Sequence, residues 1–83
     1  MKLPRDIGGE DLIKLLAKFG YEVVRQTGSH VRLKSEVTGR THFITIPLHK
    51  PLKLGTLNNI LSDIAEYLKI SKKGLVERLL SKV

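Results

Sequence analysis

The 83-residue chain contains no cysteine and no tryptophan, and only four of its residues are phenylalanine or tyrosine. Without cysteine there is no disulfide, no thiolate metal ligand and no cysteine nucleophile. No stretch free of Asp, Glu, Lys and Arg exceeds nine residues, far short of the ~18 apolar residues that span a bilayer. The first residues also lack the apolar core of a signal peptide. We therefore expect a soluble, cytoplasmic protein with no membrane contact.

One small domain, 1–83, accounts for a chain of this length, since domains seldom have fewer than about 50 residues. Hydrophobic residues make up 41% of the chain, which is enough for a packed core. A chain this short has one thin core and no room for a deep internal site. We expect any functional site to lie on the surface.

Basic residues outnumber acidic residues by fifteen to eight, so the formal net charge is +7. The excess is concentrated in residues 21–55, which hold six basic and two acidic residues and all three histidines. This balance favours a polyanionic partner, most often nucleic acid. A basic surface that serves only solubility, or one that meets an acidic protein, is the alternative interpretation.

Apolar residues at helical spacing predict a first helix over 9–19, with Glu10 and Asp11 favouring its N-terminal end and Gly20 as its C-terminal cap. Three strands follow, each bounded by turn residues, over 21–26, 30–34 and 41–46. Strands joined this tightly form an antiparallel sheet with one packed and one wet face. Along the second strand Val31 and Leu33 point to one side, and the other side carries His30, Arg32 and Lys34.

Helical spacing resumes over 57–68, with Thr56 as the expected N-cap. A last short helix starts after Ser71, and 70–83 form a C-terminal helical extension whose apolar side includes Leu80. The predicted class is α+β, in the order α-β-β-β-α plus a terminal helix. Phe19 and Phe43 are assigned to the core, and Tyr67 lies off the apolar stripe of its helix.

The chain contains none of the motifs that hold nucleotide phosphates through a glycine-rich loop, and no His-Glu-x-x-His zinc motif. Its histidines lack the short paired spacing of zinc ligands, so we expect no metal and no cofactor. His30 has a distinctive setting, because it follows Gly28 and Ser29 at the start of a strand whose face carries Arg32. A histidine beside cations has the minimum parts for cutting RNA without metal. The alternative is a surface histidine beside a turn.

Four sequence blocks give this chain a family resemblance. They are Gly9-Glu10-Asp11-Leu12 leading to Gly20-Tyr21, Thr27-Gly28-Ser29-His30, Ile46-Pro47-Leu48-His49, and Leu54-Gly55-Thr56-Leu57. In this order and spacing, over about residues 2–69, the chain resembles the HicA (YcfA-like) toxins. These are small mRNA interferases of toxin–antitoxin pairs.

The resemblance implies a double-stranded-RNA-binding-domain-like fold and a type II toxin that cleaves mRNA. It implies that His30 is the catalytic histidine and that a HicB-type antitoxin covers the active site. His49 is the candidate for a second acid or base, the alternative being a loop histidine that contacts phosphate or packs. His42 is interpreted as structural or incidental.

The expected RNA-binding residues lie in the turn, on the second strand and before the second helix: Gly28, Ser29, Arg32, Lys34, Lys50, Lys53 and Thr56. Unpaired amides and the helix dipole attract phosphates to a helix N-terminus. Two other functions use the same features, a non-catalytic RNA-binding module on the basic sheet face and a protein-interaction domain. Neither of these needs a proton-transfer residue at position 30.

Overall fold

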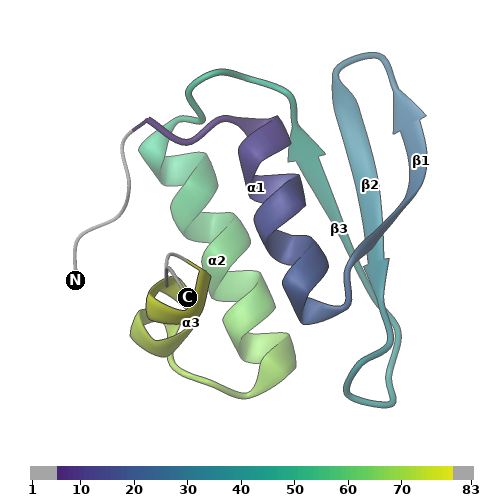
Figure 1. Ribbon diagram of the computed structural model, residues 1–83, viewed down its shortest axis with the longest axis vertical. Coiled ribbons are helices and arrows are strands. Elements are labelled where there is room, and N and C mark those ends of the chain that lie inside the picture. Colours follow the sequence, from purple (N-terminus) through teal and green to yellow (C-terminus); the bar gives the residue numbers. More distant parts are fainter. Residues whose placement is uncertain (1–5, 80–83) are drawn as a thin grey trace.

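The computed structural model describes residues 6–79. Figure 1 shows its elements, which are α1 (Gly9–Leu16), the 3-10 turn η1 (Ala17–Phe19), β1 (Glu22–Thr27), β2 (His30–Ser35), β3 (His42–Pro47), α2 (Leu54–Leu68) and α3 (Lys72–Leu79). The order confirms the predicted α+β class and its double-stranded-RNA-binding-domain-like arrangement. The predicted single domain, 1–83, extends at both ends beyond the described residues.

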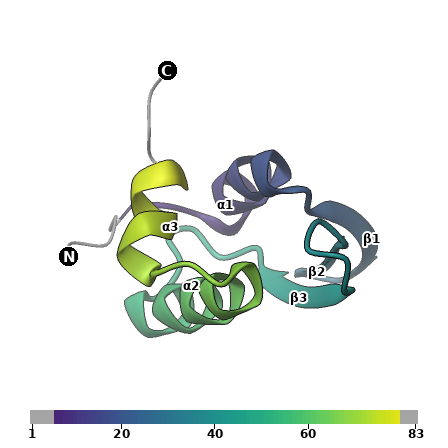
Figure 2. The same ribbon diagram turned by 90° about the horizontal axis from the view of Figure 1, so that it is seen from below.

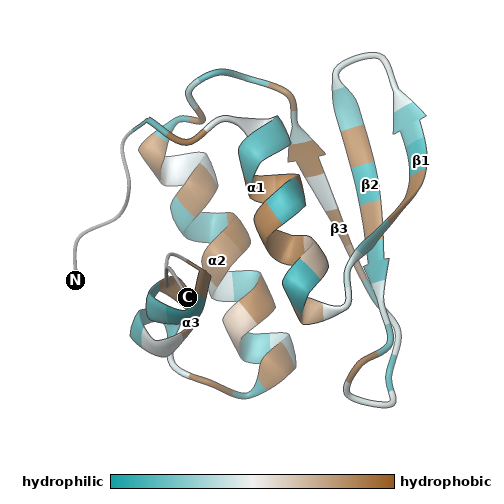
Figure 3. Cartoon of the chain, viewed as in Figure 1, coloured by the Kyte–Doolittle hydropathy of each residue, from teal (hydrophilic) through white to brown (hydrophobic). Residues whose placement is uncertain are grey.

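The sheet is antiparallel and has the strand order β1-β2-β3. Along β2 hydrophilic and hydrophobic residues alternate, as Figure 3 shows. Val31 and Leu33 are buried, while His30 and Arg32 are exposed. This confirms the predicted division of the sheet into a packed face and an open face.

The helices all lie on the packed side of the sheet, nearest to β3, and β1 is the strand farthest from α3 (Figures 1 and 2). All six residues of β1 are exposed, including Val23 and Val24. The core lies between the helices and the strands β2 and β3. Its fully buried side chains include Leu12, Leu16, Leu33, Ile46, Leu57, Leu61, Ile64 and Leu75.

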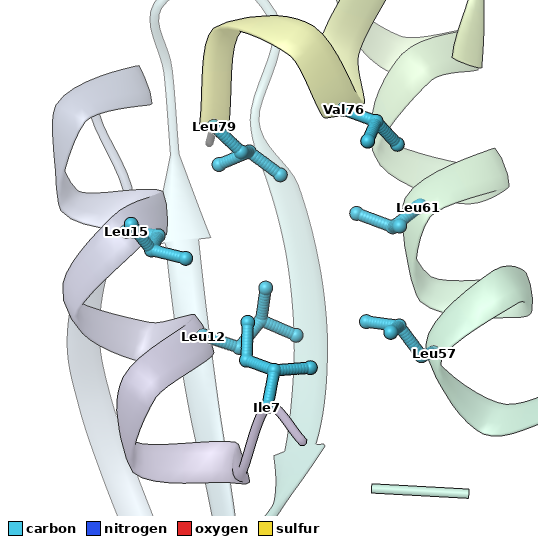
Figure 4. A pocket seen from close by; sticks show the side chains of 7 residues that line it. All are labelled: Ile7, Leu12, Leu15, Leu57, Leu61, Val76 and Leu79. Carbon is cyan, nitrogen blue, oxygen red and sulfur yellow. The ribbon is translucent and has the colours of Figure 1, made fainter. Parts of the chain in front are cut away.

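Helix α3 completes this core. Figure 4 shows a small apolar cavity where side chains of three helices point toward one another, lined by Ile7, Leu12, Leu15, Leu57, Leu61, Val76 and Leu79. Leu75, in the first turn of α3, is fully buried. The predicted C-terminal helix is therefore part of the hydrophobic core, while Leu80, assigned to the same apolar side, lies outside the described residues.

Several predicted helix ends are confirmed by the backbone. The Asp11 carboxylate accepts a hydrogen bond from the Gly8 amide at 3.1 Å, and Gly20 ends the first helical segment at φ +81°. Ser71 caps α3, because its Oγ accepts a hydrogen bond from the Gly74 amide at 2.9 Å. Each contact satisfies backbone groups that a helix end leaves unpaired.

The predicted N-cap of α2 is wrong. Lys53 is the N-cap, with an extended backbone at φ −65° and ψ 142°, and its carbonyl accepts the Leu57 amide at 2.9 Å. Leu54 and Gly55 already have helical conformation, so Thr56 lies inside the first turn. The helix therefore begins three residues earlier than the cap preference of threonine suggests.

Two aromatic assignments are also wrong, whereas Phe19 packs against the core as predicted. Phe43 is 45% exposed, because Ile44 and Ile46 face the helices and strand alternation turns Phe43 to the open face. Tyr67 is buried because the β2–β3 turn covers it.

The Tyr67 hydroxyl contacts the backbone carbonyls of Ser35 and Arg40 and accepts a hydrogen bond from the Thr38 amide. These bonds supply the polar partners that a buried hydroxyl needs. They tie the β2–β3 turn to the C-terminal end of α2, so a residue predicted outside the apolar stripe has a structural role. Among residues 6–79, no helix is long and apolar enough to cross a membrane.

Candidate active site

His30 is presented by a two-residue turn between β1 and β2. Thr27 pairs with His30 across the turn, which consists of Gly28 and Ser29. Gly28 has φ +58°, a left-handed conformation that glycine adopts without strain. A Cβ at Gly28 would meet no atom within 4 Å, so space around the turn is open to a ligand. The left-handed backbone of Gly28 is the geometry that its expected role in shaping this turn requires.

On the open face His30 lies in a shallow hollow with two arginines and two threonines. The lining side chains are Arg25, Thr27, His30, Arg32 and Thr45. Of these, sequence reasoning had identified only His30 and Arg32.

The missing residues follow from the register. A two-residue turn pairs Thr27 with His30, and Arg25 with Arg32, while Thr45 lies opposite Arg32 on β3. The two-residue turn was the signal that could have found Thr27 and Arg25. The bulge between Val23 and Arg25 lies farther from the turn and shifts only the pairing of Val23 and Glu22 with β2.

The β3–α2 loop is fastened to the same turn. The Leu48 amide donates to the Ser29 carbonyl at 2.7 Å, and the Gly9 amide donates to the His49 carbonyl at 2.9 Å. A Cβ at Gly9 would collide with the Pro47 carbonyl oxygen, so only glycine allows α1 to start this close to the loop. Three of the four sequence blocks therefore meet at one edge of the fold.

The His49 side chain lies in a different hollow from His30. This second hollow is lined by Gly8, Gly9, Glu10, Asp11, Leu48, His49 and Lys50, none of which lines the hollow of His30. His49 is exposed and has the carboxylates of the first turn of α1 around it. Its assignment as a second acid or base stays a prediction.

The other predicted phosphate contacts are dispersed. Lys34 lies at the far end of β2 between two carboxylates, at 3.3 Å from Glu36 and 4.0 Å from Glu22. Lys53 is exposed at the start of α2, and Thr56 is half-buried in the first turn of that helix. Only Arg32 among the predicted cations shares the hollow of His30.

His42 belongs to a separate polar network on the packed side. Its Nδ1 is 2.6 Å from the Tyr21 hydroxyl, its Nε2 is 3.2 Å from an Asp63 carboxylate oxygen, and its ring stacks on Tyr67 at 4.6 Å. Burial, and then the nearby Tyr67 and Asp63, raise the pKa of Tyr21, so its hydroxyl stays protonated. The network connects the start of β3 to α2, which supports the structural interpretation of His42.

Within the described 6–79 region, no three side chains of His, Cys, Asp or Glu come together as a metal-binding group.

The imidazole of His30 is accompanied by cations and hydroxyls on a face that the helices leave uncovered. Such a site has a proton acceptor and groups able to hold a phosphate.

Comparison with known proteins gives one family. A protein-family model described as HicA toxin of bacterial toxin-antitoxin matches residues 9–65, from the start of α1 to near the end of α2. No curated protein and no solved structure matches the chain. The matched region covers more than half of the 83 residues and includes the whole sheet with its turn at Gly28. The chain therefore belongs to the HicA toxin family of bacterial toxin–antitoxin systems.

Proposed function

We propose that this toxin is a metal-independent endoribonuclease that cleaves mRNA in the cytoplasm, with His30 as its single catalytic histidine. The observation that carries the proposal is the place of His30, exposed on the open sheet face in one hollow with Arg25 and Arg32. Family membership supports the toxin role in general. The hollow supports the specific chemistry.

In the proposed reaction, neutral His30 takes the proton of a ribose 2′-hydroxyl, and the oxygen attacks the adjacent phosphorus. The P–O5′ bond breaks, which leaves a 2′,3′-cyclic phosphate on one fragment and a 5′-hydroxyl on the other. The imidazolium, or a water molecule, returns a proton to the departing 5′-oxygen. Arginine charges stabilise the extra negative charge on the phosphate as the oxygen attacks.

The remaining predicted site residues have supporting roles in this proposal. Gly28 and Ser29 shape the turn that presents His30, and Arg32 holds the phosphate. Lys34, Lys50, Lys53 and Thr56 remain predicted contacts to more distant parts of the RNA. His49 remains the candidate for a separate proton donor, although its hollow lies beside α1.

Incubation of the purified chain with a long RNA in excess chelator tests the nuclease function. We expect wild-type protein and Glu77→Ala to cut the RNA, and His30→Ala to leave it intact with an unchanged circular dichroism spectrum. Glu77→Ala is the control, since it truncates another exposed side chain, on α3, that lines neither hollow. RNA binding without cleavage by wild-type protein would indicate the RNA-binding module, and absence of both would indicate the protein-interaction domain.

The partner we propose is a HicB-type antitoxin that places acidic or apolar groups over His30 and Arg32. Charge complementarity would speed association with a chain of net charge +7. Hydrogen-exchange mapping of the co-expressed complex tests this, with protection expected in β2 and the Gly28–Ser29 turn. Protection confined to α3, with His30 still reactive toward diethylpyrocarbonate, would contradict direct occlusion.

A further inference from the structure

Two arginines face each other across the open side of the sheet beside His30. Arg25 of β1 is the direct cross-strand partner of Arg32 of β2, and both are exposed. Directly opposed like charges destabilise an antiparallel pair. Neither guanidinium forms an ion pair with a carboxylate of residues 6–79, whereas Lys34 on the same strand has two such partners. The sheet neutralises its basic charge at one end and leaves it uncompensated at the end that carries His30.

The hollow between these arginines has the donors that a phosphate needs. Thr45 is the partner of Arg32 on β3, so the Arg32 side chain lies between a second cation and a hydroxyl. Thr27 adds another hydroxyl beside His30, and among residues 6–79 no carboxylate lines the hollow. Guanidinium groups bind phosphate oxygens through paired hydrogen bonds, and hydroxyls donate to the same acceptors.

An exposed aromatic ring extends this surface. Phe43 lies on the open face and is 45% exposed, and the Arg32 Cζ is 4.6 Å from its ring centroid. The cation–π contact holds the guanidinium over the ring. The opposite side of a guanidinium held in this way is a flat surface on which a nucleobase stacks.

We propose that the open face binds one nucleotide of single-stranded RNA next to the cleaved bond. Arg25 and Arg32 clamp its phosphate, and its base stacks on the Arg32 guanidinium, which Phe43 supports. This site rests on the proposed ribonuclease function and adds the substrate class, unpaired RNA, and the residues that select it. Bases inside a duplex are already stacked on their neighbours, so a duplex has no free base face for Arg32.

The phosphate clamp is tested by binding measurements on protein carrying His30→Ala, in which the RNA stays intact. We expect Arg25→Gln to raise the Kd for a fluorescent RNA 12-mer about tenfold. It also lowers the slope of log Kd against log salt by about 0.7. Arg40→Gln is the matched control, because Arg40 is exposed in the β2–β3 turn and loses the same charge. Equal weakening by both substitutions would overturn the clamp.

The base-stacking site is tested with Phe43→Leu in the same background. We expect this variant to raise the Kd about tenfold without changing the salt slope, since a stacked base is lost but no charge. An abasic nucleotide moved along the 12-mer should weaken binding at one position with Phe43 present and at none with Phe43→Leu. The same abasic profile in both proteins would overturn the stacking site, as would equal affinity for a blunt duplex of that length.

These outcomes separate the nucleotide site from the nuclease function. Wild-type protein that binds RNA through Arg25 and Phe43 but does not cut it contradicts the nuclease function alone. Protein that cuts RNA, and whose affinity is unchanged by Arg25→Gln and Phe43→Leu, contradicts the nucleotide site alone. Both positions are exposed, so each variant is expected to keep the circular dichroism spectrum of its parent.

Discussion

The hydroxyl of buried Tyr21 and Nδ1 of His42 share a hydrogen bond of 2.6 Å. The Asp63 carboxylate can only accept, so the contact at 3.2 Å takes its hydrogen from Nε2 of His42. With that hydrogen on Nε2, Nδ1 of a neutral ring accepts the hydrogen of the Tyr21 hydroxyl. One arrangement of protons satisfies all three side chains, and it joins β3 to α2 on the side of the sheet away from His30.

Removal of the Tyr21 hydroxyl tests this network. We expect Tyr21→Phe to lower the free energy of unfolding in urea by about 1–3 kcal/mol, because Nδ1 of His42 loses its donor in a half-buried position. Asp63→Asn should cost less, since the amide oxygen can still accept from Nε2. Equal stability of Tyr21→Phe and wild-type protein would contradict the network.

The same hydroxyl makes the free energy of unfolding depend on pH in the alkaline range. The pKa of Tyr21 is raised in the folded chain, so above its ordinary value, near 10, the unfolded chain loses a proton that the folded chain keeps. Deprotonation then favours the unfolded state, so the contribution of Tyr21 to the free energy of unfolding falls by up to about 1.4 kcal/mol per pH unit as pH rises. The difference in unfolding free energy between wild-type protein and Tyr21→Phe should shrink between pH 9 and 11. A constant difference over that range would contradict the raised pKa.

Two glycines of helix first turns should respond to alanine with opposite signs. Gly9→Ala collides with the Pro47 carbonyl and comes within 2.9 Å of the Leu48 Cα, so we expect a loss of about 1–3 kcal/mol of unfolding free energy. Gly55→Ala meets nothing within 4 Å and should stabilise the chain by about 0.4–1 kcal/mol. Thermal unfolding of both variants, compared with wild-type protein, measures the sign of each change in stability. A stabilising Gly9→Ala would show that α1 does not hold the β3–α2 loop this closely.

Lys50 and Lys53 are exposed and, in the described part of the chain, have no carboxylate partner. If they contact RNA phosphates, their joint replacement by glutamine lowers the salt slope of RNA binding by about 0.7 for each contact. The accompanying loss of affinity should be the same for all RNA sequences, because phosphate contacts do not read the bases. Lys18 and Lys73, exposed on helical segments, provide a control with the same change of charge. An unchanged slope would mean that Lys50 and Lys53 only solvate the loop.

Helix α3 lies beyond the residues that match the family, yet its stability contribution should be large. Leu75→Ala empties a fully buried position and is expected to cost about 2–5 kcal/mol. Glu77→Ala, on the exposed side of the same helix, should change stability by less than about 0.5 kcal/mol. Urea unfolding distinguishes the two. Similar small effects from both substitutions would show that the core does not depend on α3.

The order of helices and strands was predictable because the period of the apolar residues changes from helix to strand and back. Val31 and Leu33 alternate with His30 and Arg32, and this local pattern determines which side of β2 meets the core. The same alternation places Phe43 on the side of β3 opposite to Ile44, so its exposure is also predictable from the sequence. The place of His30 on an exposed face followed from the sequence for this reason.

Only the tertiary structure decided which distant side chains surround His30. The pairing of β3 with β2 brings Thr45 opposite Arg32, and no local preference in the sequence sets the register of these two strands. Tyr67 is buried because a turn more than twenty residues away folds over it, and Tyr21 reaches His42 by the same long-range packing. Sequence periodicity reports the surroundings of a residue along its own element. Contacts between elements depend on how their faces fit together, and they can be read only from the folded chain.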